Sequence, residues 1–289
     1  MSREQRPVVI TGASRGFGAA LARHVAGLGH DVAICARGSG GLAVLASQLR
    51  EEFGTAAVAV SLDVTDEAAV REFAAQVASD LGPCCGVLNN AGILGPVGAV
   101  DQLDLGAWRH TLDVNLVGTL LVTAAFVPQL AQGGGAIVNV SGAGIGGPGL
   151  LGTVSAYTTS KGAVVTLTEA LSIELRKRHI RVNAFAPGVL KTGFMNAALD
   201  AAPETVDEEL LAVASAVGSS GDQTPINLDA NQAELISFLI SNESAWLTGK
   251  LVSARWDTVT SLKARREHLV GTSLLNLRRI DGTLFDEAK

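Results

Sequence analysis

A short apolar run that ends in a glycine-rich turn does most to restrict the fold of this chain. Val8–Ile10 is followed by the turn Thr11–Gly18, and apolar residues at helical spacing then continue to Leu28. A strand, a glycine-rich turn and a helix in this order form an anion site. The glycines let backbone N–H groups approach a pyrophosphate, and the helix N-terminus carries partial positive charge. The pattern therefore predicts a dinucleotide-binding unit at the start of the chain.

Strand and helix patterns continue to alternate after this unit. Apolar runs at 32–36, 57–62 and 86–88 are each separated by helical segments, for example 67–81. Strands that alternate with helices of about a dozen residues indicate βαβ units and a parallel sheet. The polar and glycine clusters follow these strands, at the sheet edge where such folds bind ligands. We therefore expect an α/β fold of the Rossmann type, with a doubly wound parallel sheet and flanking helices.

Composition limits the partners. The formal net charge is -6 and no basic stripe is present, which argues against nucleic acid. The three cysteines form neither a disulfide framework nor a metal-ligand spacing. The uncharged stretch 114–160 contains many glycines and polar residues, so it indicates buried strand and loop rather than a membrane span. With no signal-peptide pattern, we expect a cytoplasmic protein with reduced thiols, no metal and no membrane partner.

The end of the second predicted strand bears on the choice of nucleotide. An acidic residue there would accept the ribose 2′-hydroxyl of NAD, whereas a basic residue would pair with the 2′-phosphate of NADP. Ala36 offers no acid at this point, while Arg37 and Arg15 offer two guanidinium groups. The pattern favours NADP(H) over NAD(H), although either arginine could instead be a solvated surface charge.

The only tyrosine of the chain, Tyr157, precedes Lys161 by four residues. On a helix this spacing places the phenol and the ammonium on one face. A fixed cation nearby favours phenolate and should lower the pKa of the tyrosine from about 10. The pair therefore predicts a group that transfers protons near neutral pH, although a helix can also carry such a pair by chance.

Taken together, these motifs resemble the short-chain dehydrogenase/reductase family, of the classical type. The resemblance covers about Pro7 to Ala254 and implies that the parallel sheet has seven strands. It rests on the turn Thr11–Gly18, Asp63, Asn89–Gly92, Asn115, Tyr157 with Lys161, and Pro187-Gly188 followed by Thr192.

The resemblance implies a role for each matching residue. Tyr157 would exchange a proton with the substrate oxygen, Lys161 would hold the nicotinamide ribose, and Asn115 would sustain a water chain or serve only as a structural amide. The implied cofactor contacts are Gly12, Ser14, Arg15, Gly16, Phe17, Gly18, Arg37, Asp63, Val64, Asn90, Ala91, Gly92, Pro187, Gly188, Leu190 and Thr192, together with Tyr157 and Lys161.

One catalytic position departs from the family. The serine that hydrogen-bonds the substrate oxygen aligns with Gly142, and the loop from there to Tyr157 is longer than usual. Ser141 could take this role if the loop is displaced, or Ser155 or Thr153 could supply the hydroxyl. The chain could also have no such serine. Loss of one oxyanion donor typically lowers the rate about 10²–10³-fold, so a slower enzyme remains compatible with the sequence.

The C-terminal third differs most from the family. Residues 1–257 are expected to form the catalytic domain, with a substrate lid at about 193–227 that is rich in acidic residues. The acidic run is either a solvated helix face or a surface that steers a cationic substrate. Residues 258–289 form an extension, which either packs as a surface helix and an arm on a neighbouring subunit or, with Trp256, closes part of the active site.

The leading functional hypothesis is an NADP(H)-dependent oxidoreductase that interconverts a secondary alcohol and a ketone. A dinucleotide-binding sensor or scaffold without chemistry is an alternative, because Gly142 replaces the serine. An epimerase or dehydratase that oxidises its substrate transiently is a third. Family members are often tetramers, so a tetrameric or dimeric homo-oligomer is expected. The substrate and the direction of the reaction are not fixed by these residues.

Overall fold

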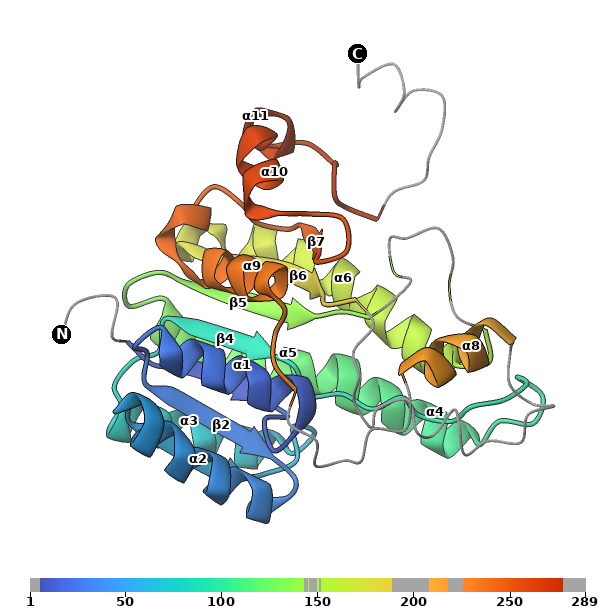
Figure 1. Cartoon of the computed structure of the whole chain (residues 1–289), viewed down its shortest axis with the longest axis horizontal. Coiled ribbons are helices and arrows are strands. Elements are labelled where there is room, and N and C mark those ends of the chain that lie inside the picture. The colour runs from blue at the N-terminus through green and yellow to red at the C-terminus, as the bar shows by residue number, and fades with distance from the viewer. Residues whose placement is uncertain are drawn as a thin grey trace.

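The computed structural model describes residues 6–142, 145, 150, 152–188, 208–217 and 226–277. These residues form a seven-stranded, wholly parallel sheet in the order β3-β2-β1-β4-β5-β6-β7 (Figure 1). The strands are β1 Val8–Thr11, β2 Val32–Ala36, β3 Ala57–Ser61, β4 Gly86–Asn89, β5 Gly135–Val140, β6 Ile180–Ala186 and β7 Leu251–Ser253. The predicted Rossmann-type sheet is confirmed.

Helices cover both faces of this sheet. The α-helices of the described residues are α1 Gly16–Gly27, α2 Ser39–Phe53, α3 Glu67–Asp80, α4 Leu105–Leu112, α5 Gly118–Leu130, α6 Ser155–Glu174, α8 Glu208–Val217, α9 Ala230–Ile240, α10 Val259–Ala264 and α11 Arg266–Leu269. Helices α1, α2 and α9 share one hydrophobic cluster with Val8 and Ile10, whereas α3, α5 and α6 share the other with Val9. Because successive strand residues point to opposite faces, β1 contributes to both cores.

The segment Leu105–Leu130 is helical throughout, with a π-helical turn at Asp113–Val117 between α4 and α5. The sequence had suggested strand and loop from residue 114, so this expectation was wrong for 114–130. Because α5 is apolar on nearly every side, its sequence shows no helical period. Among the described residues, this helix is the one that is long and apolar enough to cross a membrane. Half of its most apolar window is buried in the domain, as in a core helix.

The described part of the C-terminal extension packs onto the same domain. Val259, Leu262 and Leu269 belong to the hydrophobic cluster of α1 and α9. The buried Lys250 donates hydrogen bonds to the carbonyl groups of Thr272 and Leu274, at 2.6 and 2.9 Å. The extension is therefore fixed beside β7 as far as residue 277.

Candidate active site

The glycine turn after β1 is packed so tightly that side chains do not fit. A Cβ atom added to Gly18 would overlap the carbonyl oxygen of Gly12 and lie 2.5 Å from Asn90 Nδ2. Gly12 and Gly16 have φ angles of +66° and +57°, which favour glycine. The N-cap residue Arg15 provides no side-chain cap to α1, so the N–H groups of the first turn are available to an anion. The turn therefore fits a pyrophosphate.

Thr11 and Asn90 join this turn to the loop after β4. Thr11 Oγ1 accepts hydrogen bonds from the backbone N–H groups of Asn90 and Ala91, at 3.0 and 2.9 Å. Asn90 Nδ2 donates to the carbonyl groups of Thr11 and Gly12, at 2.9 and 3.2 Å. Thr11 was assigned no separate role from the sequence. The signal that could have identified it is a hydroxyl side chain at the end of a strand, next to a glycine.

The side chain of Phe17, by contrast, lies in the core. Its ring stacks on that of Phe185 in β6, with centroids 6.4 Å apart. Of the predicted contacts in this turn, Phe17 can therefore face a nucleotide only through its backbone.

Three residues that were predicted to contact the cofactor lie at the carboxyl ends of β2 and β3, namely Arg37, Asp63 and Val64. Arg37 follows β2 and is exposed, and its carbonyl oxygen accepts a 2.9 Å hydrogen bond from Ser61. Burial would raise the pKa of Asp63, but two hydrogen bonds from Thr65 and the positive charges of Arg37 and His110 outweigh it and lower the pKa below its ordinary value. Asp63 is thus a carboxylate with arginine nearby.

Val64 packs on the first turn of α5, where a Cβ at Gly118 would lie 2.6 Å from its Cγ2. In the glycine turn after β1, Ser14 faces α2: a Cβ at Gly41 would lie 2.7 Å from the carbonyl oxygen of Ser14. These contacts place Ser14 against the first turn of α2 and Val64 beside the helix that carries Asn115.

Three further predicted residues lie close together near the carboxyl ends of β4 and β5, namely Lys161, Asn115 and Gly92. Lys161 is buried, and its Nζ donates a 2.8 Å hydrogen bond to the carbonyl oxygen of Val140. A Cβ at Gly92 would lie 3.1 Å from Asn115 Oδ1 and 3.4 Å from Lys161 Nζ, so these three residues are neighbours. Asn115 belongs to the π-helical turn, a distortion that is frequent at functional sites.

The amide of Asn115 holds backbone in place. Its Oδ1 accepts from Ile93 N–H at 2.8 Å, while its Nδ2 donates to Ile93 O and to Ser160 Oγ, both at 2.9 Å. These contacts correspond to the structural alternative for Asn115. A water chain through this residue stays a prediction.

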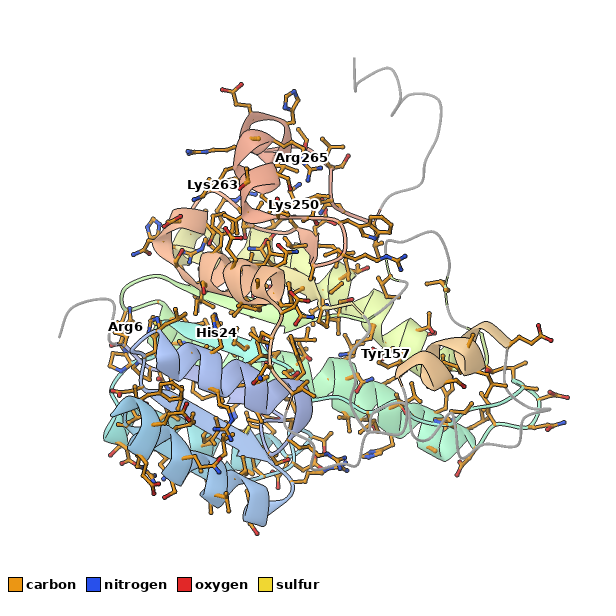
Figure 2. All side chains as sticks on the ribbon, in the orientation of Figure 1. Arg6, His24, Tyr157, Lys250, Lys263 and Arg265 are labelled. Atoms are coloured by element: carbon orange, nitrogen blue, oxygen red, sulfur yellow. The ribbon has the colours of Figure 1, made fainter. Side chains whose placement is uncertain are left out.

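Tyr157, labelled in Figure 2, lies on α6 together with Lys161, as expected. Lys161 Nζ is 6.0 Å from the centre of the phenol ring. The direction of the tyrosine pKa differs from the sequence expectation. Burial raises the pKa of Tyr157 above its ordinary value, and burial also lowers the pKa of Lys161 to about 8. Desolvation of the phenol sets the direction of this shift, and the ammonium of Lys161 contacts Val140 O.

Gly142 faces the hydroxyl group of Tyr157. A Cβ atom at residue 142 would lie 2.7 Å from Tyr157 Oη. Each hydroxyl considered as a substitute has another contact. Ser141 Oγ donates to Lys161 O at 3.4 Å, Ser155 Oγ accepts from Trp108 Nε1 at 3.1 Å, and Thr153 Oγ1 donates to Gly152 O at 2.8 Å.

The last predicted cofactor contacts are only partly described. The carbonyl oxygen of Pro187 accepts a 2.8 Å hydrogen bond from Gln232 Nε2 on α9, and Gly188 has a φ of +83°. Leu190, Thr192 and the lid lie outside the described residues, apart from α8 and residues 226–227. Gln232 was not among the site residues predicted from the sequence.

A buried polar ladder below the site was also not predicted. Asn89 Nδ2 donates to Thr123 Oγ1 and Asn139 Oδ1, at 3.0 and 2.9 Å, and Asn139 Nδ2 donates to Thr168 Oγ1 at 2.9 Å. The ladder joins the central strands β4 and β5 to α5 and α6. It thereby fixes the helix that carries Tyr157 relative to the sheet.

The family model described as short chain dehydrogenase matches residues 6–203 of this chain. The chain belongs to the short-chain dehydrogenase family. This family binds a nicotinamide nucleotide, in agreement with the fit of the glycine turn to a pyrophosphate.

Two relatives of this chain are named as dehydrogenases of hydroxylated compounds, and one of them is named as inactive. The chain is 37% identical to the inactive 2-(S)-hydroxypropyl-CoM dehydrogenase 2 of Xanthobacter autotrophicus over 71% of this chain and 86% of the relative. It is 32% identical to the trans-4-hydroxycyclohexanecarboxylate dehydrogenase of Sinomonas cyclohexanicum, over 85% of this chain and 89% of the relative.

Among solved structures, NAD⁺-bound xylitol dehydrogenase is similar, with a TM-score of 0.72 and 28% identity. The match covers 87% of this chain and 98% of that one. The protein is therefore an NAD(P)-dependent oxidoreductase of the class that acts on CH–OH groups.

Proposed function

We propose that this short-chain dehydrogenase interconverts a secondary alcohol and a ketone with NADP(H), and that Tyr157 is its general acid and base. The observation that carries this proposal is the position of Tyr157 and Lys161. They stand on one helix, next to Gly92 and Asn115, at the sheet edge where the glycine turn ends. Ligands of parallel α/β sheets bind at this edge.

The residues divide the reaction between them. When bound, the nicotinamide accepts a hydride from the alcohol carbon or returns it to the ketone carbon. Tyr157 donates its proton to the carbonyl oxygen during reduction and takes it back during oxidation. The phenol of Tyr157 is protonated in the free enzyme, so its proton is present for reduction, but the raised pKa by itself makes the phenol a weaker acid. Lys161 supplies positive charge that favours the phenolate formed by that step.

Ionisation of the sole tyrosine tests this proposal without knowledge of the substrate. We expect tyrosinate absorbance in the ultraviolet to rise only well above pH 10 in the free protein, because burial raises the pKa of Tyr157. Addition of NADP⁺ is expected to lower this pKa by at least about one unit, since a cationic ring nearby favours phenolate. Tyr157→Phe supplies the blank. A titration that NADP⁺ leaves unchanged would contradict the acid–base role.

The preference for NADP(H) is supported by the charges around the end of β2. Arg37 is exposed there, beside the carboxylate of Asp63, and no acid occupies position 36. The first turn of α2 begins at Ser39 with glycines, and its N-cap residue Gly38 offers no side chain, so its N–H groups add to the attraction for an anion. The similar xylitol dehydrogenase contains NAD⁺, so direct measurement of both nucleotides is needed.

Replacement of Arg37 tests the nucleotide preference. We expect Arg37→Ala to weaken NADP⁺ binding about 10–100-fold, because a charge-assisted hydrogen bond contributes about 1.5–3 kcal/mol. Binding of NAD⁺, which lacks the phosphate, should change less than about twofold. Calorimetric titration of both nucleotides measures this. The matched control is Arg23→Ala, which removes an arginine of α1 that pairs with Gln48 and Glu52. Equal losses for both nucleotides would contradict the preference.

Two other functions stay open to the same experiments. A non-catalytic dinucleotide sensor is favoured by Gly142 and by the word "inactive" in the name of one relative. It would bind NADP(H) but turn over none of a broad panel of alcohols and ketones. An epimerase or dehydratase would retain its nucleotide and convert substrate without net change in NADPH absorbance.

We further propose that residues 1–257 form the catalytic domain, with a substrate lid at about 193–227, and that residues 258–289 form an extension. A homo-oligomer is supported by exposed apolar side chains on the helices next to the site, namely Val117, Leu120 and Ile173. A cytoplasmic location stays a prediction.

A further inference from the structure

The contact between Gly142 and Tyr157 is closer than any side chain at residue 142 allows. A Cβ atom there would lie 2.7 Å from Tyr157 Oη and 3.0 Å from both Cε1 and Cζ. Real Cβ atoms do not approach other heavy atoms this closely, since dense packing leaves no overlap. A residue with a side chain therefore requires either the phenol or the backbone at residue 142 to move.

The backbone on the strand side of this contact is held firmly. Ser141 precedes Gly142, and its N–H donates a 2.8 Å hydrogen bond to Phe185 O in β6. Ser141 Oγ also donates to Lys161 O on α6, at 3.4 Å. The end of β5 is therefore tied to the neighbouring strand and to the helix that carries Tyr157.

The helix side is held as well. Ser160 Oγ donates to Tyr157 O at 2.7 Å and accepts from Asn115 Nδ2 at 2.9 Å. Ala156, next to Tyr157, is fully buried. Because Ser141 and the helix are tied in place, and the end of a side chain moves more easily than backbone, we expect the phenol to move if residue 142 gained a side chain.

We propose that Gly142 is a positioning residue, whose missing side chain leaves the space that the phenol of Tyr157 occupies. The replacement of the family serine is then part of the arrangement of this site, and a serine restored at residue 142 would displace the tyrosine instead of assisting it. The consequence for catalysis rests on the proposed function, but the displacement does not. The chain thus presents the tyrosine hydroxyl to the substrate without the serine as a second donor at residue 142.

The sole tyrosine makes the displacement directly visible. In protein labelled with ¹³Cζ-tyrosine, NMR gives one tyrosine signal. We expect Gly142→Ala and Gly142→Ser to shift this signal, and the control Gly162→Ala to leave it in place. Gly162 is on the same helix as Tyr157, and a Cβ there meets nothing within 4 Å. Both Gly142 variants should also lose about tenfold or more in kcat, because a misplacement of about 1 Å is costly.

The design separates this inference from the proposed function. An unchanged tyrosine signal in both Gly142 variants, or a higher kcat in Gly142→Ser, overturns the positioning role. If no variant turns over substrate but the signal still shifts, the positioning role stands and the oxidoreductase proposal fails. If Gly142→Ala folds poorly, a thermal double-mutant cycle with Tyr157→Ala decides the matter. Removal of the ring should relieve most of the loss in Tm, and additive losses overturn the inference.

Discussion

Replacing Tyr157 with phenylalanine is expected to lower kcat about 10²–10⁴-fold, the usual contribution of a general acid or base. Phenylalanine keeps the ring next to Gly142 and Lys161 but removes the proton. Nucleotide binding should change less than about threefold, because the glycine turn and the Thr11–Asn90 contacts remain. Steady-state rates on cyclic secondary alcohols and polyols, with quenching of tryptophan fluorescence by NADPH, measure the two effects separately.

The pH dependence sharpens this prediction. In the proposed mechanism, reduction requires the protonated phenol and benefits from a charged Lys161, whose pKa is lowered to about 8 by burial. The charge of Lys161 is present below this pKa and lost above it, so kcat/KM for reduction should fall as the pH rises through about 8. Thr159→Ala, an exposed change on the same helix, should behave like wild type. Near-normal turnover in Tyr157→Phe would assign the proton transfer to another group.

Local sequence was sufficient to predict those features that only one residue type or one order of elements can form. Gly12 and Gly18 were assigned to a pyrophosphate turn because a strand, a glycine-rich turn and a helix follow one another, and in the structure a Cβ at either position would be too close to backbone. The parallel sheet was predicted because its strands alternate with helices, which permits few topologies. The stretch at 118–130 was misjudged as strand and loop because a helix that is apolar on nearly every side shows no period in its sequence.

The chemistry of the site depended on contacts between distant residues. The spacing of Tyr157 and Lys161 gave their common helix, but the sign of the tyrosine pKa shift depends on burial by other elements. Ser155 was a candidate hydroxyl, and its contact with Trp108, 47 positions earlier, could not be seen from the local sequence. Gln232 and the Asn89–Asn139 ladder likewise act across the fold, with no motif to mark them.

Gly18→Ala tests the nucleotide site most severely. The added methyl group would overlap the carbonyl oxygen of Gly12 and lie 2.5 Å from Asn90 Nδ2 and 2.9 Å from the carbonyl carbon of Gly12. Because most of these atoms are backbone, the turn itself must shift. Overpacking of this kind costs about 1–3 kcal/mol of stability. We expect binding of both NADP(H) and NAD(H) to weaken at least about 100-fold, since the N–H groups that face the pyrophosphate move together.

Gly27→Ala is the matched control because it makes the same change at the other end of α1. Its Cβ would lie 3.5 Å from the ring of Phe53, an ordinary contact, so stability should hold or rise by up to about 1 kcal/mol through helix propensity. Calorimetric titration and thermal unfolding compare the two variants. If Gly18→Ala unfolds earlier yet binds NADP(H) like wild type, the turn is needed for packing alone, and the pyrophosphate must lie elsewhere along the sheet edge.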